Sequence, residues 1–227
     1  MEKETKYIIH TCPQRLWYVE KYLIPSLQSQ YIPRNSIFIQ LDCNNIGTLE
    51  NFIKSAKYAA TEEGGVWHLQ DDVLICKHFK QITEQYNEGI VCGIATKFDR
   101  ERKECCGEVG LHQMWYSFPC IRIPNEVMNG FVEWFETYMR GNPVYRKLIE
   151  SKKHDDMMFR MYLEDNYEEH ELKITNLNPN IVEHIDWLIG GSVTNKIRDD
   201  KIIRSLYFKD EELVLQLEKE LNFTVRK

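Results

Sequence analysis

Residues 64–75 read GGVWHLQDDVLI, an apolar run that begins after two glycines and stops on two adjacent aspartates, Asp71 and Asp72. The glycines predict a turn, and residues 66–70 predict a buried β-strand behind it. Neighbouring carboxylates repel each other and resist removal from water, so beside an apolar strand they persist most easily when a cation or polar ligand compensates them. The alternative is a solvated turn in which aspartate caps the next element.

Two strands and two helices are predicted before this segment. Residues 7–10 and 36–42 are short runs rich in β-branched residues, typical of strands. Residues 16–30 have apolar side chains at helical spacing, with Pro25 expected to bend or divide the helix, and residues 48–60 form a second helical pattern. Alternating strands and helices predict a parallel sheet, whose ligand crevice lies at the carboxyl ends of the strands.

The second half of the chain is expected to add strands and helices to this sheet. A polar stretch over residues 97–110 is typical of a loop or a hairpin. No linker or internal repeat interrupts the order, which predicts a single α/β domain over residues 1–227. The expected elements are strands over 89–95 and 114–124 and helices over 79–86, 127–139, 154–163 and 210–221.

The composition indicates a globular protein. The 227 residues are 43% hydrophobic and 12% aromatic, which is ample for a core. A charged start and the lack of a long apolar segment predict a cytoplasmic protein that does not enter the membrane. The formal net charge of −6 argues against a surface adapted throughout to nucleic acid, although residues 97–103 and 146–153 are locally basic. The seven cysteines are expected as reduced thiols.

The order of elements, with Gln70-Asp71-Asp72 after the third strand, resembles the GT-A glycosyltransferases, which bind a nucleotide-sugar on a Rossmann-like sheet. The resemblance implies a mostly parallel central sheet flanked by helices, with a smaller mixed sheet on the acceptor side. It implies a nucleotide-sugar-binding half over residues 1–95, an acceptor and catalytic half over 96–209 and a C-terminal helix over 210–227. The implied activity is metal-dependent transfer of a sugar from a nucleotide-sugar, with a UDP-sugar favoured, to a hydroxyl group.

The aspartate pair falls where the resembling family carries its metal motif of the Asp-x-Asp type, with Gln70 in place of the first aspartate. The resemblance implies Asp72 as the metal ligand and Asp71 as a contact to the sugar or ribose. The implied metal is Mn²⁺ or Mg²⁺, which bridges diphosphate oxygens and stabilises the leaving group. His184 is implied as a second ligand, because neutral imidazole coordinates Mn²⁺. A hydrogen-bonded core histidine is the alternative.

The remaining donor contacts implied by the resemblance lie in loops. Arg15 follows the first strand and is expected to reach the diphosphate or the base, and Asp42 follows the second strand and is expected at the base or ribose. The late run Gly190-Gly191-Ser192 is expected to present backbone N–H groups to phosphate, with Lys196 or Arg198 adding charge. An exposed arginine, a turn-forming aspartate and a glycine turn are the structural alternatives.

A second acidic pair, Asp155-Asp156, opens a predicted helix, where the resemblance implies a general base that accepts the proton of the attacking hydroxyl. Both which aspartate acts and whether transfer inverts or retains configuration stay open, and stabilisation of the helix dipole is the alternative role. Trp115, Tyr116 and Ser117 are implied on the acceptor side, where aromatic rings stack on a sugar or base, with core packing as the alternative.

The overall style of the chain is similar to small glycosyltransferase-like proteins of bacteriophages and prophages. Phage enzymes of this kind glycosylate hydroxymethylated pyrimidines in DNA, so DNA in the host cytoplasm is a candidate acceptor. A nucleotidyl or phosphoryl transferase is a second hypothesis, which the lack of a Walker A loop after the first strand disfavours. A binding module that keeps the fold without turnover is a third.

Overall fold

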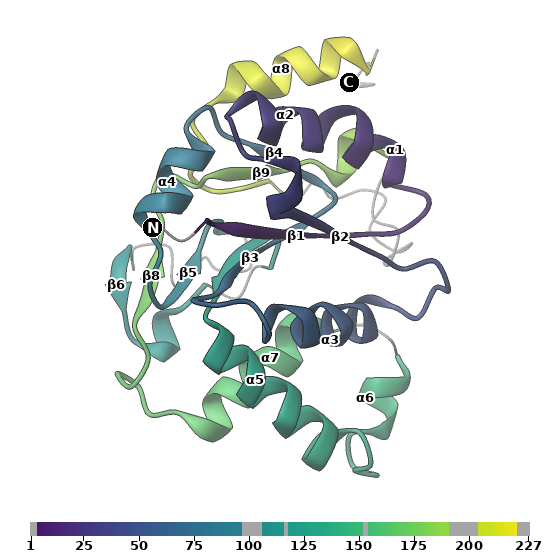
Figure 1. Cartoon of the computed structure of the whole chain (residues 1–227), viewed down its shortest axis with the longest axis vertical. Coiled ribbons are helices and arrows are strands. Elements are labelled where there is room, and N and C mark those ends of the chain that lie inside the picture. Colours follow the sequence, from purple (N-terminus) through teal and green to yellow (C-terminus); the bar gives the residue numbers. More distant parts are fainter. Residues whose placement is uncertain (1–3, 97–105, 116–117, 152–153, 191–203, 222–227) are drawn as a thin grey trace.

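The computed structural model describes residues 4–96, 106–115, 118–151, 154–190 and 204–221, and it has a central β-sheet with helices on both faces (Figure 1). The strand order of the sheet is β2-β1-β3-β7-β5-β8-β6. Its strands are β1 (Lys6–Thr11), β2 (Ile37–Leu41), β3 (Val66–Gln70), β5 (Ile90–Cys92), β6 (Gly107–Val109), β7 (Cys120–Ile123) and β8 (Ile174–Asn176).

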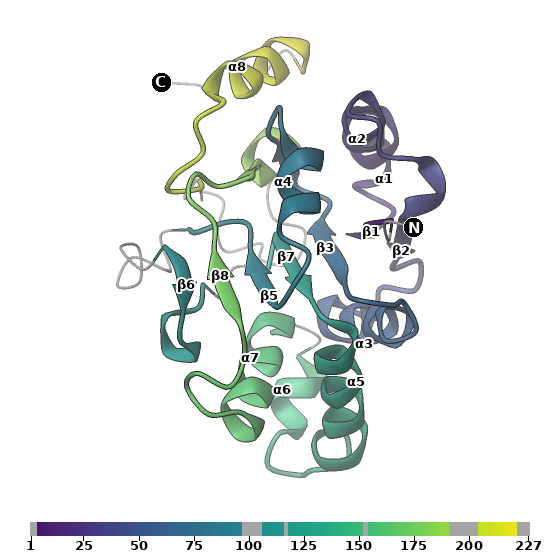
Figure 2. The same ribbon diagram turned by 60° about the vertical axis from the view of Figure 1, so that its left-hand side comes forward.

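The central sheet is mostly parallel. Strand β1 pairs in parallel with β2 and β3, and β5 pairs in parallel with β8. Strand β7 lies between β3 and β5 and is antiparallel to both, so β3 and β5 run in the same direction (Figure 2). Strand β6 is antiparallel to β8. Among the described strands of this sheet, β6 and β7 are thus the two that run against the others.

A second, two-stranded sheet pairs β4 (Val73–Ile75) with β9 (Val182–His184). The predicted α/β class, with a mostly parallel central sheet and a smaller second one, is confirmed. The small sheet is antiparallel rather than mixed. It begins directly after the Asp71–Asp72 pair, so it connects that pair to a segment more than a hundred residues further along the chain.

Helices cover both faces of the central sheet (Figure 1). One face carries α3 (Thr48–Ala59), α5 (Asn125–Trp134), α6 (Arg146–Glu150) and α7 (Asp155–Asn166), and the other carries α1 (Leu16–Tyr18), α2 (Ile24–Ser29), α4 (Phe79–Gln85) and α8 (Glu211–Glu220). A π-helical segment, Val19–Leu23, joins α1 to α2, so residues 16–29 form one continuous helical run with Pro25 inside it. The π-helical turn lies just before the proline, whose missing N–H removes one helical hydrogen bond. In the parts of the chain that the structure describes, no helix has the length and apolar character needed to cross a membrane.

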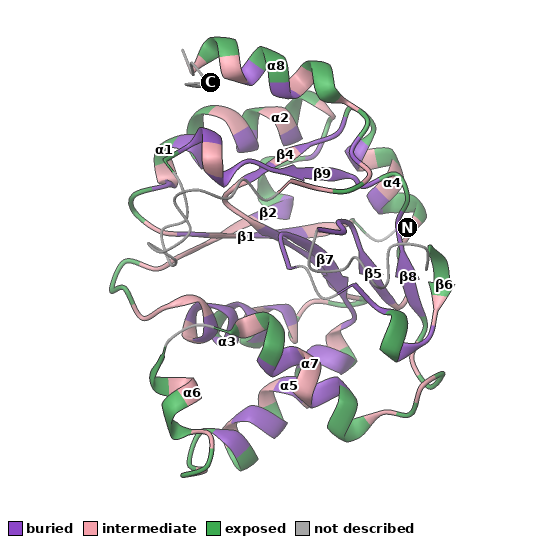
Figure 3. Ribbon diagram, turned by 180° about the vertical axis from the view of Figure 1, so that it is seen from behind, coloured by how far each residue is buried: buried purple, intermediate pink, exposed green. Residues whose placement is uncertain are grey.

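The hydrophobic core forms one cluster on each face of the sheet, because successive strand residues point to opposite sides. On β1, Ile8 belongs to the cluster beneath α3 and α5, whereas Tyr7 and Ile9 belong to the cluster beneath α1 and α2. Figure 3 shows this burial as continuous purple along the central strands. The two clusters fix the orientation of β1 to β3, and therefore the positions of the residues that follow them.

The predicted strand over residues 114–124 is wrong in its extent. Strand β7 covers Cys120–Ile123 alone, and a 3₁₀ turn, Leu111–Gln113, precedes this region. The Trp115 backbone N–H donates to the Asn176 side-chain oxygen at 3.2 Å, so it does not take part in a strand ladder. The backbone here is irregular, yet it carries three buried side chains, Met114, Trp115 and Phe118. Their apolar sequence is the same as that expected of a buried strand.

Candidate functional site

A cavity of about 400 Å³ lies beyond the carboxyl ends of β1, β2 and β3, and the first residues of α3 and α7 close its other side. It is the edge of the sheet at which the sequence predicts the ligand crevice. Six of the predicted site residues line it: Arg15, Asp42, Gln70, Asp71, Asp72 and Asp155.

The parallel register brings these residues together. Thr11 at the end of β1 pairs with Leu41 of β2, and His10 pairs with Gln70 of β3, so the three strands end at nearly the same level. The Asp42 backbone N–H then donates to the Thr11 carbonyl at 2.8 Å and extends this alignment by one residue. Residues that follow three different strands therefore share one cavity.

Arg15 lies against both members of the aspartate pair. Its Nη1 atom is 3.7 Å from Asp71 Oδ1 and 3.4 Å from Asp72 Oδ2. The Arg15 side chain is 3% exposed, and those of Asp71 and Asp72 are 13% and 15% exposed, so water screens these ion pairs weakly. The Cys12 backbone N–H also donates to Asp71 Oδ2 at 3.3 Å. The loop after β1 thus holds the pair with a cation and a backbone donor.

The two aspartates have different acidities. Burial and the neighbouring Asp72 charge raise the pKa of Asp71, although Arg15 acts in the opposite direction. Burial also acts to raise the pKa of Asp72, but His184 and Arg15 outweigh it and hold that pKa below its usual range. Asp72 is therefore the carboxylate that stays ionised, as a metal ligand must.

His184 reaches Asp72 through the small sheet. Its Cα pairs with that of Val73 across β4 and β9, and the Ile185 N–H donates to the Asp72 carbonyl at 2.8 Å. The imidazole Nε2 lies 3.4 Å from Asp72 Oδ2, and Nδ1 lies 3.4 Å from Asp186 Oδ1. A carboxylate on the second ring nitrogen orients a histidine ligand. Asp186 was not among the candidates from the sequence. The one local indication was its position two residues after His184.

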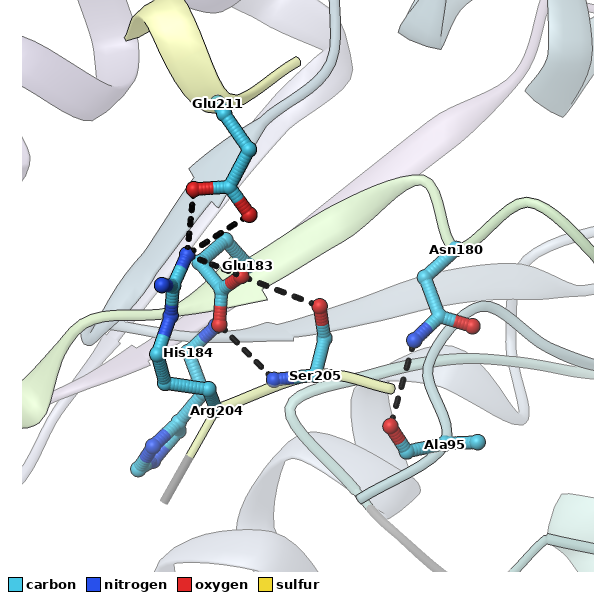
Figure 4. Close-up of polar contacts among 7 residues, drawn as sticks. All are labelled: Ala95, Asn180, Glu183, His184, Arg204, Ser205 and Glu211. Atoms are coloured by element: carbon cyan, nitrogen blue, oxygen red, sulfur yellow. Dashed lines mark hydrogen bonds and ion pairs between the residues drawn. The ribbon is translucent and has the colours of Figure 1, made fainter. Parts of the chain in front are cut away.

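A buried carboxylate on the opposite side of β9 fixes the strand that carries His184 (Figure 4). Glu183 is 1% exposed and accepts hydrogen bonds from the Ser205 backbone N–H at 2.7 Å and the Ser205 hydroxyl at 3.1 Å. Arg204 donates to Glu183 at 3.3 Å and also to Glu211 of α8 at 2.7 Å. Figure 4 shows the His184 ring on the other side of the strand. Sequence reasoning missed this arrangement, because nothing local links Glu183 to Ser205.

The atoms around Asp72 fit a divalent cation in part. Asp72 Oδ1 is buried and has no hydrogen-bond partner among the described residues, so it has a free lone pair to offer. Carboxylate and imidazole together suit Mn²⁺. Within the same residues no group of three or more His, Cys, Asp and Glu side chains is arranged to hold a metal. A cation here would take its remaining ligands from water and from diphosphate oxygens, as Mg²⁺ commonly does.

Asp155 and Asp156 occupy different environments. Asp155 lines the cavity, is half-buried and accepts a hydrogen bond from the Thr48 side chain. Burial, with a smaller contribution from Asp156, raises the pKa of Asp155 to about 6. Asp156 is exposed, and its Oδ1 accepts the Met157 N–H at 2.7 Å. Asp155 is thus the member of this pair that faces the cavity.

Asp42 and Gln70 also line the cavity, with backbone roles of their own. The Asp42 carboxylate accepts the N–H groups of Ile46 and Gly47 at 2.8 and 2.9 Å, which closes the turn into α3. The Gln70 N–H donates to the Pro119 carbonyl at 3.0 Å and completes the end of β3. The predicted turn role of Asp42 and its place at the cavity therefore coexist.

Two other predicted residues, Trp115 and Gly190, do not line the cavity. Trp115 is fully buried and stacks on Tyr207 with ring centroids 5.8 Å apart, so its position corrects the expected acceptor contact to a core role. Gly190 is an exposed turn residue with φ of +105°. The remaining candidates lie outside the described residues: Tyr116, Ser117, Gly191, Ser192, Lys196 and Arg198.

Comparison with known proteins finds no matching family and no matching curated sequence. Among solved structures, A197 from STIV is 13% identical with a TM-score of 0.43, over 80% of this chain and 86% of that one. A putative glucose-1-phosphate thymidylyltransferase from Bacillus anthracis is 9% identical with a TM-score of 0.43, over 87% and 96%. HddC from Yersinia pseudotuberculosis is 10% identical with a TM-score of 0.36, over 76% and 89%. Likenesses this distant carry no argument about activity.

Proposed function

We propose that this chain is a glycosyltransferase that uses a divalent cation to move a sugar from a nucleotide-sugar, with a UDP-sugar favoured, to a hydroxyl group. One observation supports the proposal above all. A single cavity at the carboxyl ends of parallel strands is lined by Asp72, which lies 3.4 Å from the His184 imidazole, and by Asp155, which comes from a separate element. The pKa of Asp72 is lowered and that of Asp155 is raised, so Asp72 suits a metal ligand and Asp155 suits a general base.

Asp72 and His184 would hold Mn²⁺ or Mg²⁺ in this proposal. When bound, such an ion neutralises diphosphate charge and stabilises the leaving nucleotide. Asp71, next to Asp72 and held by the Cys12 N–H, would face the sugar or ribose hydroxyls of the donor. Asp42 and the loop after β1 would line the nucleotide part of the cavity.

Asp155 would act as the base. The acceptor oxygen forms its bond to the anomeric carbon as the bond from that carbon to the diphosphate oxygen breaks, and the hydroxyl proton passes to the Asp155 carboxylate. A pKa of about 6 makes Asp155 a better proton acceptor than an ordinary aspartate while leaving it ionised at neutral pH. Thr48, which donates to Asp155, would orient the carboxylate. The anomeric configuration of the product distinguishes an inverting course from a retaining one.

We extend the proposal to a DNA acceptor bearing a hydroxymethylated pyrimidine. Arg146 and Lys147 of α6 are exposed, and Ser151, which follows this helix, lines the cavity. Positive charge beside the cavity would attract the phosphate backbone, and a base turned out of the duplex would present its hydroxyl to Asp155.

The test is a donor-hydrolysis screen across nucleotide-sugars, combined with calorimetric titration of UDP in Mn²⁺ and in EDTA. We expect slow hydrolysis of one donor class and UDP binding that depends on the cation. Equal binding in EDTA would overturn the role of the metal. Binding without hydrolysis or transfer would favour the non-catalytic module, and synthesis of a nucleotide-sugar from a sugar phosphate and a nucleoside triphosphate would favour a nucleotidyltransferase.

A further inference from the structure

Arg15 is buried and already contacts carboxylates, whereas an arginine free to bind a phosphate would be exposed and without an anionic partner. The residue is 2% exposed, and its guanidinium already lies between the two aspartates rather than in open solvent. Its backbone is fixed as well, because the N–H groups of Arg15 and Leu16 both donate to the Cys12 carbonyl, at 3.0 and 3.1 Å. We therefore expect a change of position in the Arg15 side chain rather than in its backbone.

The guanidinium faces the same carboxylate that the proposed cation needs. Asp72 Oδ2 is 3.4 Å from Arg15 Nη1 and 3.4 Å from His184 Nε2. An arginine carries a fixed positive charge, so it offsets the charge of one of the two carboxylates while it stays there. A divalent cation bound by Asp72 would lie close to this fixed positive charge, and two cations at such a distance repel each other strongly in a poorly screened site.

We propose that Arg15 is the resident counter-ion of the Asp71–Asp72 pair, and that its positive charge opposes binding of a divalent cation to Asp72, including the Oδ1 atom that is unpaired among the described residues, until the guanidinium moves away. This inference rests on the proposed cation site. Without a ligand, the guanidinium offsets part of the negative charge and repels an incoming cation, so the site binds Mn²⁺ weakly. An incoming diphosphate offers the guanidinium a new anionic partner, so the nucleotide frees Asp72 for the cation. Arg15 thereby makes loading of the cation depend on the presence of the donor.

The experiment measures binding of Mn²⁺ alone by calorimetry, with no nucleotide present. The proteins compared are the parent, Arg15→Met, Arg15→Gln, Arg15→Lys and the double variant Arg15→Met/Asp72→Asn. We expect the Met and Gln variants to bind Mn²⁺ about tenfold to a hundredfold more tightly than the parent, because a nearby positive charge is removed. We expect the Lys variant to resemble the parent and the double variant to lose the gain.

Thermal unfolding gives a second readout that does not depend on activity. Removal of Arg15 leaves two neighbouring carboxylates without their cation, so the melting temperature of Arg15→Met in EDTA should fall, and Mn²⁺ should restore it. The parent should show little response to Mn²⁺ alone. The inference is overturned if folded Arg15→Met and Arg15→Gln bind Mn²⁺ no more tightly than the parent.

Titration of UDP with and without Mn²⁺ on the parent separates this inference from the proposed function. Cation-dependent UDP binding together with unchanged Mn²⁺ affinity in the Arg15 variants would overturn the competition and leave the proposed function intact. Cation-independent UDP binding together with tighter Mn²⁺ binding by the Arg15 variants would support the competition and overturn the use of the cation in donor binding.

Discussion

Two buried arginines lie at opposite ends of the parallel strands, and their partners differ in kind. Arg122 of β7 lies at the amino ends of β3 and β5, where it donates to the backbone carbonyls of Gly64, Asn87 and Gly89. Arg15 lies at the carboxyl ends, where it faces the carboxylates of Asp71 and Asp72. One arginine thus satisfies neutral backbone groups, and the other balances charge.

The difference separates a structural end of the sheet from a functional end. Backbone carbonyls are fixed, so the hydrogen bonds of Arg122 hold the loops that start β3 and β5 and leave nothing for a ligand to exchange. Carboxylates next to a single arginine keep negative charge for which another cation or a polar ligand competes. Substitutions at the amino end should therefore change stability, and those at the carboxyl end should change binding or turnover.

The largest expected effect is at the carboxyl end, in the variant Asp155→Asn. We expect the rate of sugar transfer to fall about a hundredfold to ten-thousandfold, because the amide cannot accept the hydroxyl proton. UDP affinity should stay at the parent value. Transfer rates and UDP titration on the parent, on Asp155→Asn and on the exposed control Asp156→Asn measure this. Full turnover by Asp155→Asn would show that Asp155 is not the base.

At the amino end, Arg122→Met should have the largest effect on stability. Three backbone carbonyls lose the donor that a buried side chain supplies, so we expect the free energy of unfolding to fall by about 3 to 5 kcal/mol, measured by urea denaturation. UDP affinity per folded molecule should be unchanged, and Arg122→Lys should recover part of the loss. A variant of parental stability with impaired UDP binding would reverse the assignment of the two ends.

A smaller loss is expected for Gly89→Ala in the loop that Arg122 holds. Gly89 has φ of +65°, and an added Cβ would lie 2.3 Å from the Lys173 carbonyl oxygen, so the substitution combines backbone strain with a clash. We expect a loss of about 2 to 3 kcal/mol in the free energy of unfolding. Gly107→Ala is the matched control, since Gly107 has φ of +86° but open space around the new atom. Equal losses in the two variants would show that the clash with the Lys173 carbonyl adds nothing to the cost of the backbone strain.

The smallest effect concerns the pH dependence of stability at Asp155. Its pKa is about 6 in the folded protein and 3.8 ordinarily, so folding favours the protonated acid. Its contribution is complete below about pH 4 and is lost as the pH rises through 6. Relative to Asp155→Asn, the parent should therefore be less stable at pH 8 than at pH 4. The expected difference is about 1 to 2 kcal/mol, since part of the carboxyl group stays near solvent. Urea denaturation of both proteins at the two pH values measures it.

Much of the fold was predictable, because glycine, proline and charged residues mark where the helices and strands of the first half begin and end. The strand over residues 66–70 was predicted with the bounds that β3 has, since glycines precede it and charged residues follow it. The strand over residues 114–124 was wrong because burial on both sides of irregular backbone gives the same apolar run as a central strand. Periodicity reports burial, and only hydrogen bonding distinguishes these two cases.

The site was predictable to the extent that it follows from topology. Asp42, Asp71 and Asp72 each come directly after a strand, and a parallel sheet must bring such positions to one edge. Trp115 was predicted to contact the acceptor because aromatic rings stack on sugars and bases, yet its ring is in the core. Glu183 and Asp186 were missed because their roles depend on partners that are distant in sequence or on the pairing of β9 with β4.

By itself, the sequence determined the α/β class, the order of the first strands and helices, and the presence of acidic residues at the strand ends, because these depend on periodicity, turn residues and the geometry of parallel sheets. Only the tertiary structure decided that Asp155 rather than Asp156 faces the cavity, that His184 lies beside Asp72, and that Arg15 is paired with the aspartates. These facts depend on the direction in which each side chain points once distant segments are packed, and no local pattern encodes that direction.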